Sequence, residues 1–381
     1  MNTHILFTAR DIGAAHQIKH IINAFISKGI KASVVASGEA YNFLEKERVR
    51  SDLFSLDNRK AFVPRNSPEE LLGELLESSR EIILKKQPDA VFCGLATLGF
   101  GIDEAVLYWT SSERLNIPSF QFIDTWGTFN HLRDGYPDLY FAIDKASEKL
   151  GNMGAKAPIQ VVGSPKHFAY LSKPLDTLRE VTRERLGIEE NEKLVGYFGQ
   201  DPEIPGHTFN FRVMVQAIQG CKYNEKKCKF LIRPHPGYKD KYEVYWKYLK
   251  DMCIDAIIPS DEFSVEEVLC ACDIVSTCFS TVGVDHAYLS CSSEDPIGVV
   301  IYLLCGSEIK DHLLENFGYW KIPLLEEGIG LFVEEQSQML NKIEYVFSNP
   351  LAVTDYFKAT KSLNLDYPCE KIVDTVLSFV P

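Results

Sequence analysis

A proline-stiffened segment that carries a cation and an imidazole, Arg233-Pro234-His235-Pro236-Gly237, directly follows a short apolar run. The two prolines and the glycine favour a rigid turn at the end of a strand. Arg233 can pair with phosphate oxygens, and His235 can donate a hydrogen bond to an oxyanion. A stiff surface loop in which the histidine only caps a helix is the alternative. The segment predicts an anion-binding turn.

A second pattern with the same chemistry is Ser280-Thr281, between the apolar run 272–277 and a helical segment that begins near Val282. Hydroxyl groups and the free amides of a helix start can hold a phosphate group, helped by the helix dipole. Ser and Thr are also ordinary N-caps, and a cap can bind an anion as well. Together with the 233–237 segment, Ser280 and Thr281 predict a phosphate site.

Acidic and aromatic residues in the first half of the chain are candidates for acid–base work. Asp11 follows the first apolar run and precedes Gly13, so it fits either a general base or a helix N-cap. His16 lies one helical turn further on and is a lesser candidate for contact with an acceptor. Three further acceptor-side candidates surround one later loop: Asp124, Trp126 and His131.

The elements that must position these residues alternate between apolar runs and segments of helical period. Strands are expected at 4–9, 31–36, 90–93, 118–123, 139–143 and 159–162, and then at 194–198, 229–232, 256–258, 273–277 and 298–302. Helical spacing between them includes 15–28, 68–86, 209–219 and 242–253. This alternation predicts mostly parallel sheets covered by helices on both faces. Gly199 and Gln200 directly follow the strand expected at 194–198.

The length of 381 residues predicts two α/β domains. We expect an N-terminal domain at 1–164, a second domain at 165–350, and a helical C-terminal segment at 351–381 that packs back on the first domain. Two such domains facing each other across a cleft would present ligands at the carboxyl ends of their strands.

Composition narrows the class of protein. Hydrophobic residues make up 45% and charged residues 24%, as in ordinary globular proteins. The net charge of −13 argues against nucleic-acid binding, which needs clustered cations. The sequence shows neither a signal peptide nor a bilayer-spanning apolar run, and its ten cysteines lack zinc spacing. We therefore expect a cytoplasmic protein without a metal site, and contact with the inner face of a membrane stays open.

The phosphate motifs resemble those of the GT-B glycosyltransferase superfamily, in which two Rossmann-like domains face each other. His235-Pro236 after a strand, followed by the run 272–277 and Ser280-Thr281, is similar to CDP-glycerol glycerophosphotransferase-like enzymes and to bacterial sialyl- and polysialyltransferases. The segment 121–128 resembles their Trp-His-Gly-Thr segment, although no histidine separates Trp126 from Gly127. The segment 162–168 resembles their Gly-x-Pro-Arg segment, with Lys166 in place of the arginine.

This resemblance implies a function and a set of roles. We expect a metal-independent glycosyltransferase of polysaccharide biosynthesis that moves a sugar from a CMP-, CDP- or UDP-linked donor to a glycan or lipid-linked acceptor. Asp11 would be the base, and His235 would act on the leaving phosphate. The nucleotide sugar would be a co-substrate, with no further cofactor. The expected donor-binding residues are Gly199, Gln200, Arg233, His235, Pro236, Gly237, Ser280 and Thr281.

Two alternatives remain open from the sequence. A nucleotide-sugar 2-epimerase uses a similar two-domain fold and similar phosphate contacts. A non-catalytic nucleotide-sugar binding protein would also retain the phosphate site, and the missing histidine after Trp126 is compatible with it.

Overall fold

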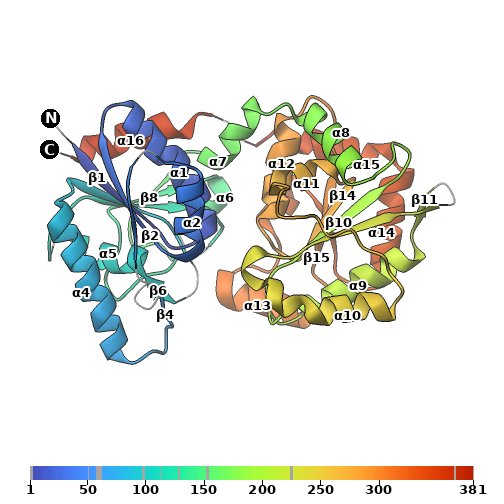
Figure 1. The fold of residues 1–381 in the computed structure, drawn as a ribbon, viewed down its shortest axis with the longest axis horizontal. Helices are drawn as coiled ribbons and strands as arrows, with labels where there is room; N and C mark the ends of the chain where they lie inside the picture. Colours follow the sequence, from blue (N-terminus) through green and yellow to red (C-terminus); the bar gives the residue numbers. More distant parts are fainter. Residues whose placement is uncertain are drawn as a thin grey trace. The chain divides into compact units, whose positions relative to one another are not determined.

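The computed structural model describes residues 3–380 apart from 50, 57–61, 97–98, 112, 128, 152–153, 224–225 and 364–365, and apart from the side chains of 226, 227 and 236. The chain forms two compact units (Figure 1). Unit 1 consists of Met1–Phe168 and Leu365–Pro381, and unit 2 of Ala169–Asn364. The helical segment expected at 351–381 is therefore divided, because α15 (Pro350–Thr360) belongs to unit 2 and α16 (Pro368–Phe379) to unit 1.

Unit 1 contains a parallel sheet of seven strands in its described part, in the order β3-β2-β1-β5-β7-β8-β9. The strands are β1 (His4–Ala9), β2 (Lys31–Ala36), β3 (Asp52–Ser55), β5 (Ala90–Cys93), β7 (Ser119–Ile123), β8 (Leu139–Ala142) and β9 (Ile159–Val161). The chain builds outwards from β1 in one direction and from β5 in the other. The carboxyl ends of β1 and β5 therefore form the switch point at which open α/β sheets bind ligands.

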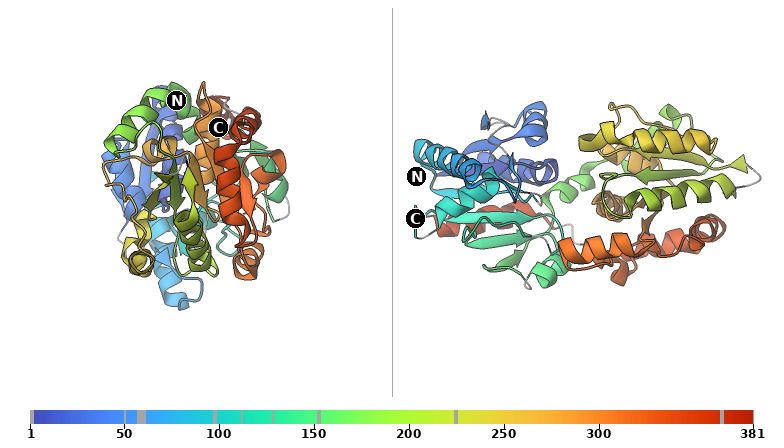
Figure 2. Two further views of the ribbon diagram at one scale, coloured as in Figure 1. Left: turned by 90° about the vertical axis from the view of Figure 1, so that its right-hand side faces the viewer. Right: turned by 90° about the horizontal axis from the view of Figure 1, so that it is seen from below.

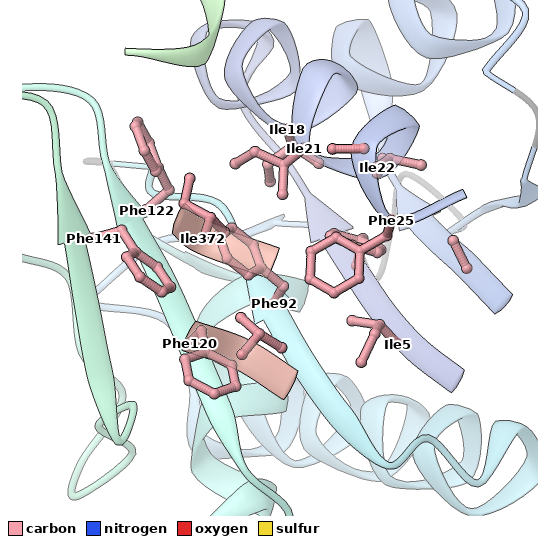
Figure 3. Close-up of a cluster of buried hydrophobic side chains, with 14 of the residues drawn as sticks. Ile5, Ile18, Ile21, Ile22, Phe25, Phe92, Phe120, Phe122, Phe141 and Ile372 are labelled. Atoms are coloured by element: carbon pink, nitrogen blue, oxygen red, sulfur yellow. The ribbon is translucent and has the colours of Figure 1, made fainter. Parts of the chain in front are cut away.

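Alternation along β1 explains the two layers of helices around this sheet. Ile5 and Phe7 belong to one buried core. Figure 3 shows Ile5 in this core together with Phe25 of α1 (Ile12–Ser27) and Ile372 of α16. Leu6 points to the opposite face, into a core shared with α4 (Glu69–Lys86) and α5 (Ile102–Thr110). Successive strand residues face opposite sides of a sheet, so one strand serves both cores. The remaining elements of unit 1 are α2 (Gly38–Lys46), β4 (Phe62–Val63), β6 (Phe100–Gly101), α6 (Lys145–Gly151) and α7 (Pro165–Phe168).

Unit 2 contains a parallel sheet of five strands in its described part, in the order β13-β10-β14-β15-β16. They are β10 (Leu194–Phe198), β13 (Lys229–Arg233), β14 (Ile274–Thr277), β15 (Val299–Leu303) and β16 (Leu331–Val333). Its switch point lies between β10 and β14. Helices lie on both faces (Figure 2): α8 (Leu175–Arg185), α9 (His207–Gly220), α10 (Glu243–Asp251), α11 (Val265–Ala271), α12 (Val282–Ser292), α13 (Ser307–Phe317), α14 (Gln338–Ser348) and α15. The hairpin β11 (Lys222–Tyr223) and β12 (Lys226–Lys227) precedes β13.

The expected strand at 256–258 is wrong. Only one bridge forms there, between Ile257 and Leu231 of the edge strand β13. Ile258 is exposed, and Pro259 follows it. Because proline has no amide proton for a ladder, the pairing stops after one residue.

Candidate functional site

The switch point of unit 2 is held together by the side chain of Gln200, in the loop after β10. Gln200 Oε1 accepts a hydrogen bond of 3.1 Å from the backbone N–H of Phe279, in the loop after β14. Phe279 directly precedes Ser280. One carboxamide therefore joins the two loops that flank the switch point and fixes the main chain in front of Ser280.

The main chain of Gln200 is fixed on both sides. Its N–H donates to His207 Nε2 at 3.1 Å, and its carbonyl accepts from the Tyr242 hydroxyl at 2.8 Å. Burial raises the pKa of Tyr242 well above its ordinary value, so the hydroxyl keeps its proton and remains a donor. A Cβ added to Gly199 would lie 1.7 Å from the same hydroxyl oxygen. The sequence therefore needs glycine at 199 for this loop to close.

His207, which sequence reasoning missed, is fully buried at the start of α9. Burial lowers the pKa of its ring to about 4, so the imidazole is neutral near pH 7. Because Nε2 accepts from Gln200, we assign the proton to Nδ1, which lies 2.6 Å from the Tyr245 hydroxyl. The Tyr197 hydroxyl is 3.3 Å from Nε2. A histidine at a helix start gives no sequence signal that its ring points inwards.

His235 stands at the end of β13, where it caps the short 3-10 helix Pro236–Tyr242. Its Nδ1 accepts a hydrogen bond of 3.2 Å from the backbone N–H of Gly237. A neutral ring with Nδ1 as acceptor carries its proton on Nε2, and that group can donate to an oxyanion. The Pro236 side chain lies outside the described part of the chain.

Arg233 is used within the protein. Its guanidinium donates to the carbonyls of Phe263 at 2.9 Å and Ser264 at 3.2 Å, just before α11 begins. Burial lowers the pKa of Arg233 from its ordinary value. These contacts tie β13 to α11, and a phosphate contact by Arg233 stays a prediction.

The start of α12 follows β14 and presents Ser280 and Thr281. Ser280 Oγ accepts from the N–H of Val282 at 3.4 Å, and the exposed Thr281 occupies the N-cap position. β14 is anchored to β10 by Thr277 Oγ1, which donates to the Phe198 carbonyl at 2.9 Å. The first amides of α12 and its dipole thus lie at the carboxyl edge of a rigid sheet, which suits an anion.

Two carboxylates lie close to Gly13 at the start of α1 in unit 1. Asp11 caps the helix by accepting from the N–H of Gly13 at 2.7 Å. An atom at the Cβ position of Gly13 would lie 3.1 Å from Asp11 Oδ1 and 3.3 Å from Asp124 Oδ2. Asp11 Oδ1 and Asp124 Oδ2 are therefore at most about 6.4 Å apart. The structure brings together two of the predicted acids, from the ends of β1 and β7.

Beside them lies a buried polar network that the sequence analysis missed. Asp103 and Glu104 are fully buried at the start of α5. Asp103 accepts from the Thr8 hydroxyl at 2.5 Å and the Arg10 N–H at 3.1 Å, and the Arg10 guanidinium is 3.3 Å from Glu104 Oε1. Asn130 Nδ2 also donates to Glu104, at 2.8 Å. Adjacent acids in an otherwise apolar stretch were a usable signal, because buried charges need partners.

The other candidates of unit 1 are held in separate places. His16 packs on Phe43, with 4.0 Å between ring centres. Trp126 is buried and its indole donates to Asp144 at 3.1 Å. His131 lies 3.1 Å from the Tyr140 hydroxyl, and burial lowers its pKa to about 4. Thr128, part of the segment that resembles the transferases, lies outside the described residues.

In the part of the chain that the structure describes, no three His, Cys, Asp or Glu side chains gather as a set of metal ligands. Among the helices of that part of the chain, none combines the length and the apolar character that a bilayer crossing requires.

One protein-family model matches part of the chain. Residues 151–291 match the family model of CDP-glycerol:poly(glycerophosphate) glycerophosphotransferases. That span includes Gln200, His207, His235, Ser280 and Thr281. No curated protein matches the sequence.

Solved structures match over nearly the whole chain. MnaA of S. aureus with UDP has a TM-score of 0.71 at 13% identity, covering 98% of this chain and 96% of that one. The UDP-GlcNAc 2-epimerase of Neisseria meningitidis, bound to UDP-GlcNAc, has a TM-score of 0.68 at 14% identity, with 99% and 100% covered. A glycosyltransferase from Rickettsia africae has a TM-score of 0.61 at 13% identity, with 99% and 98% covered. The predicted fold class is confirmed, because the chain has the two-domain α/β fold that these structures share, and the predicted resemblance to GT-B glycosyltransferases is confirmed as a resemblance.

Proposed function

We propose that this chain is a glycosyltransferase that binds the phosphate of a nucleotide-linked donor at the switch point of unit 2. The observation that carries the proposal is the joining of three loops around Gln200. Tyr242 and the Gln200 carbonyl fasten the loop after β10, and the Gln200 side chain fastens the loop after β14. The end of β13 is joined to the loop after β10, because the backbone N–H of Gly199 donates to the Arg233 carbonyl at 3.0 Å. Three strand ends thus form one preorganised surface.

This surface has the chemistry that a departing nucleotide needs. His235 supplies an Nε2–H donor, because its Nδ1 is used by Gly237. The start of α12 supplies oriented N–H groups and the positive end of a dipole. Preorganised donors of this kind stabilise charge that develops on the leaving oxygen, without a metal ion.

We propose that the acceptor hydroxyl loses its proton to a carboxylate of unit 1. Asp11 is our candidate for the base, and Asp124 is its neighbour across Gly13. Asp11 is exposed, as a group that meets a substrate must be, but its Oδ1 is shared with the Gly13 amide. Of the other predicted candidates, Trp126 and His131 have partners that give them a structural use. We propose a glycan or a lipid-linked glycan as the acceptor.

A pyrimidine nucleotide is the donor class we propose, because the matching family is named for a CDP-linked substrate and the first solved match contains UDP. A thermal-shift screen of CMP, CDP, UDP and GDP tests this directly. Ligand that binds the native state stabilises it by about 2.7 kcal/mol at 100 times its Kd. We expect a shift with a cytidine or uridine nucleotide and none with GDP.

Variants at the start and end of α12 separate the site from mere helix stability. Ser280→Ala should weaken nucleotide binding roughly 10- to 100-fold, the cost of a lost hydrogen bond to a charged group. Ser292→Ala is the matched control, because the Ser292 hydroxyl donates to the Tyr288 carbonyl at 2.9 Å near the other end of the same helix. Equal affinities in the two variants would count against the site.

A nucleotide-sugar epimerase is the second candidate, supported by the UDP-GlcNAc 2-epimerase among the structural matches. Product analysis separates the alternatives. A transferase releases nucleotide only when acceptor is present, whereas an epimerase interconverts the sugar without releasing nucleotide. A non-catalytic binding protein would bind tightly and do neither.

A further inference from the structure

We infer that His207 is a positioning residue that sets the donor-binding loop of unit 2 by holding the backbone N–H of Gln200. The inference rests on the proposed function for the identity of the ligand. It assigns to a buried side chain the task of orienting Gln200, and it assigns to the Gln200 carboxamide nitrogen a direct contact with an acceptor oxygen of the nucleotide.

The His207 ring has a fixed position. The residue is 0% exposed, and both ring nitrogens have partners, Gln200 N at 3.1 Å and the Tyr245 hydroxyl at 2.6 Å. Gly206, directly before it, has φ of 76° and lies against α13, where an added Cβ would be 2.8 Å from the Ile309 nitrogen. Packing against α13 therefore fixes the start of α9, and the His207 ring keeps its position when the loop that contains Gln200 moves.

His207 acts on the ligand-binding surface through Gln200. With its N–H held by His207 and its carbonyl by Tyr242, Gln200 has a fixed main chain. Its Oε1 is then directed to the N–H of Phe279. Because a carboxamide is planar, this contact also sets the direction of the Nε2 hydrogens, which become an oriented donor pair beside Ser280. Donors held in this way lose little entropy when a ligand binds.

His207 itself does not transfer a proton. The ring is buried, and its pKa is lowered to about 4, so it stays neutral at working pH. A buried imidazole with both nitrogens engaged has no route to substrate. Its contribution is geometric, and it passes through Gln200.

Two substitutions at His207 separate the contact with Tyr245 from the contact with Gln200. In His207→Asn, the amide nitrogen can replace Nδ1 and keep Tyr245, but nothing accepts from Gln200. In His207→Gln, the longer side chain can place its oxygen where Nε2 stands and keep the acceptor for Gln200. His286→Leu is the control, because His286 is also 0% exposed in unit 2 and has a tyrosine partner, Tyr356, at 2.9 Å.

The measurements are affinity for CDP and UDP by calorimetry, and hydrogen exchange of the segment 279–285 in the protein without nucleotide. We expect His207→Asn to speed exchange at Phe279 and to weaken binding by about tenfold, the effect of one unsatisfied buried amide. His207→Gln should stay within about threefold of the wild type in affinity, a difference well under one such bond. His286→Leu should lower Tm without either change.

Wild-type exchange at Phe279 together with wild-type affinity in His207→Asn would overturn the inference, and so would an equal loss of affinity in His207→Gln. If the unaltered protein binds neither nucleotide, the proposed function fails. The exchange rates then still decide whether His207 orders the loop.

Discussion

Replacing Gly199 by alanine adds one methyl group where the structure has no space. The new Cβ would lie 1.7 Å from the Tyr242 hydroxyl oxygen and 2.7 Å from the ring carbon that carries it. Gly199 does not have a positive φ, so the free-energy cost of the substitution comes from steric overlap and not from backbone strain. Tyr242 must move, and its 2.8 Å bond to the Gln200 carbonyl is lost.

The expected magnitude follows from these two effects. Overpacking a rigid core typically costs about 1–3 kcal/mol. Loss of the Tyr242–Gln200 bond adds about 0.5–1.5 kcal/mol. We therefore expect Gly199→Ala to lower the free energy of unfolding of unit 2 by about 2–4 kcal/mol, or roughly 5–15 °C in Tm for a domain of this size. Nucleotide binding should weaken as well, because Gln200 is displaced.

Urea unfolding followed by circular dichroism, with and without nucleotide, measures both effects. Gly73→Ala is the control, since nothing lies within 4 Å of the added atom in α4 and an alanine there should stabilise the helix slightly. Tyr242→Phe removes the nearest clashing atom, so the double variant should be about 1 kcal/mol less destabilised than the two single changes added together. Strict additivity, or a Gly199→Ala protein as stable as Gly73→Ala, would refute the reasoning.

Three further predictions concern pH, redox state and turnover. Burial lowers the pKa of His131 and His207 to about 4 from an unfolded value near 6.5, so their contribution to stability is present above pH 6.5 and is lost as pH falls towards 4. Urea titrations at pH 7 and pH 5 should differ by roughly 1–2 kcal/mol for each of these two histidines, and His207→Gln should remove the share of His207; pH-independent unfolding would contradict this. Cys221 and Cys228 are buried with 2.9 Å between their sulfur atoms, so glutathione disulfide should oxidise them to a disulfide that stabilises the fold by about 2 kcal/mol, seen by mass spectrometry as the loss of two hydrogens; if Cys221 and Cys228 both remain alkylatable after denaturation, this prediction is wrong. Asp11→Asn, which keeps an oxygen for the N-cap, should lower turnover by at least about tenfold while leaving nucleotide affinity unchanged, and a matching fall in affinity would move Asp11 to the donor site.

Several buried strands could be predicted from apolar runs in the sequence. The bounds of β1, β2, β5 and β10 agree with the expected ranges, because each is a continuous apolar run that is buried on both faces. The strands β3 and β16 were missed. Both lie at a sheet edge and are partly exposed, so their residues follow neither a helical nor an alternating pattern.

The candidate site was readable wherever a residue type itself carries the chemistry. His235 and Ser280 follow strands whose ends the sequence located, and Asp11 occupies the predicted turn. His207 and Tyr242 were out of reach, because they act through the main chain of Gln200 and only folding brings them to it. The sequence suggested which residues could bind a ligand, and the structure added what holds these candidate residues in place.

The central claim is that the three strand ends of unit 2 bind the phosphate of a nucleotide donor. A crystal structure of the full chain, soaked with the nucleotide that gives the largest thermal shift, tests it most directly. We predict phosphate oxygens within hydrogen-bonding distance of His235 Nε2, Ser280 and the first amides of α12, with Gln200 Nε2 donating to the same ligand. A nucleotide bound elsewhere, with these groups unchanged and in contact only with water, would contradict the account.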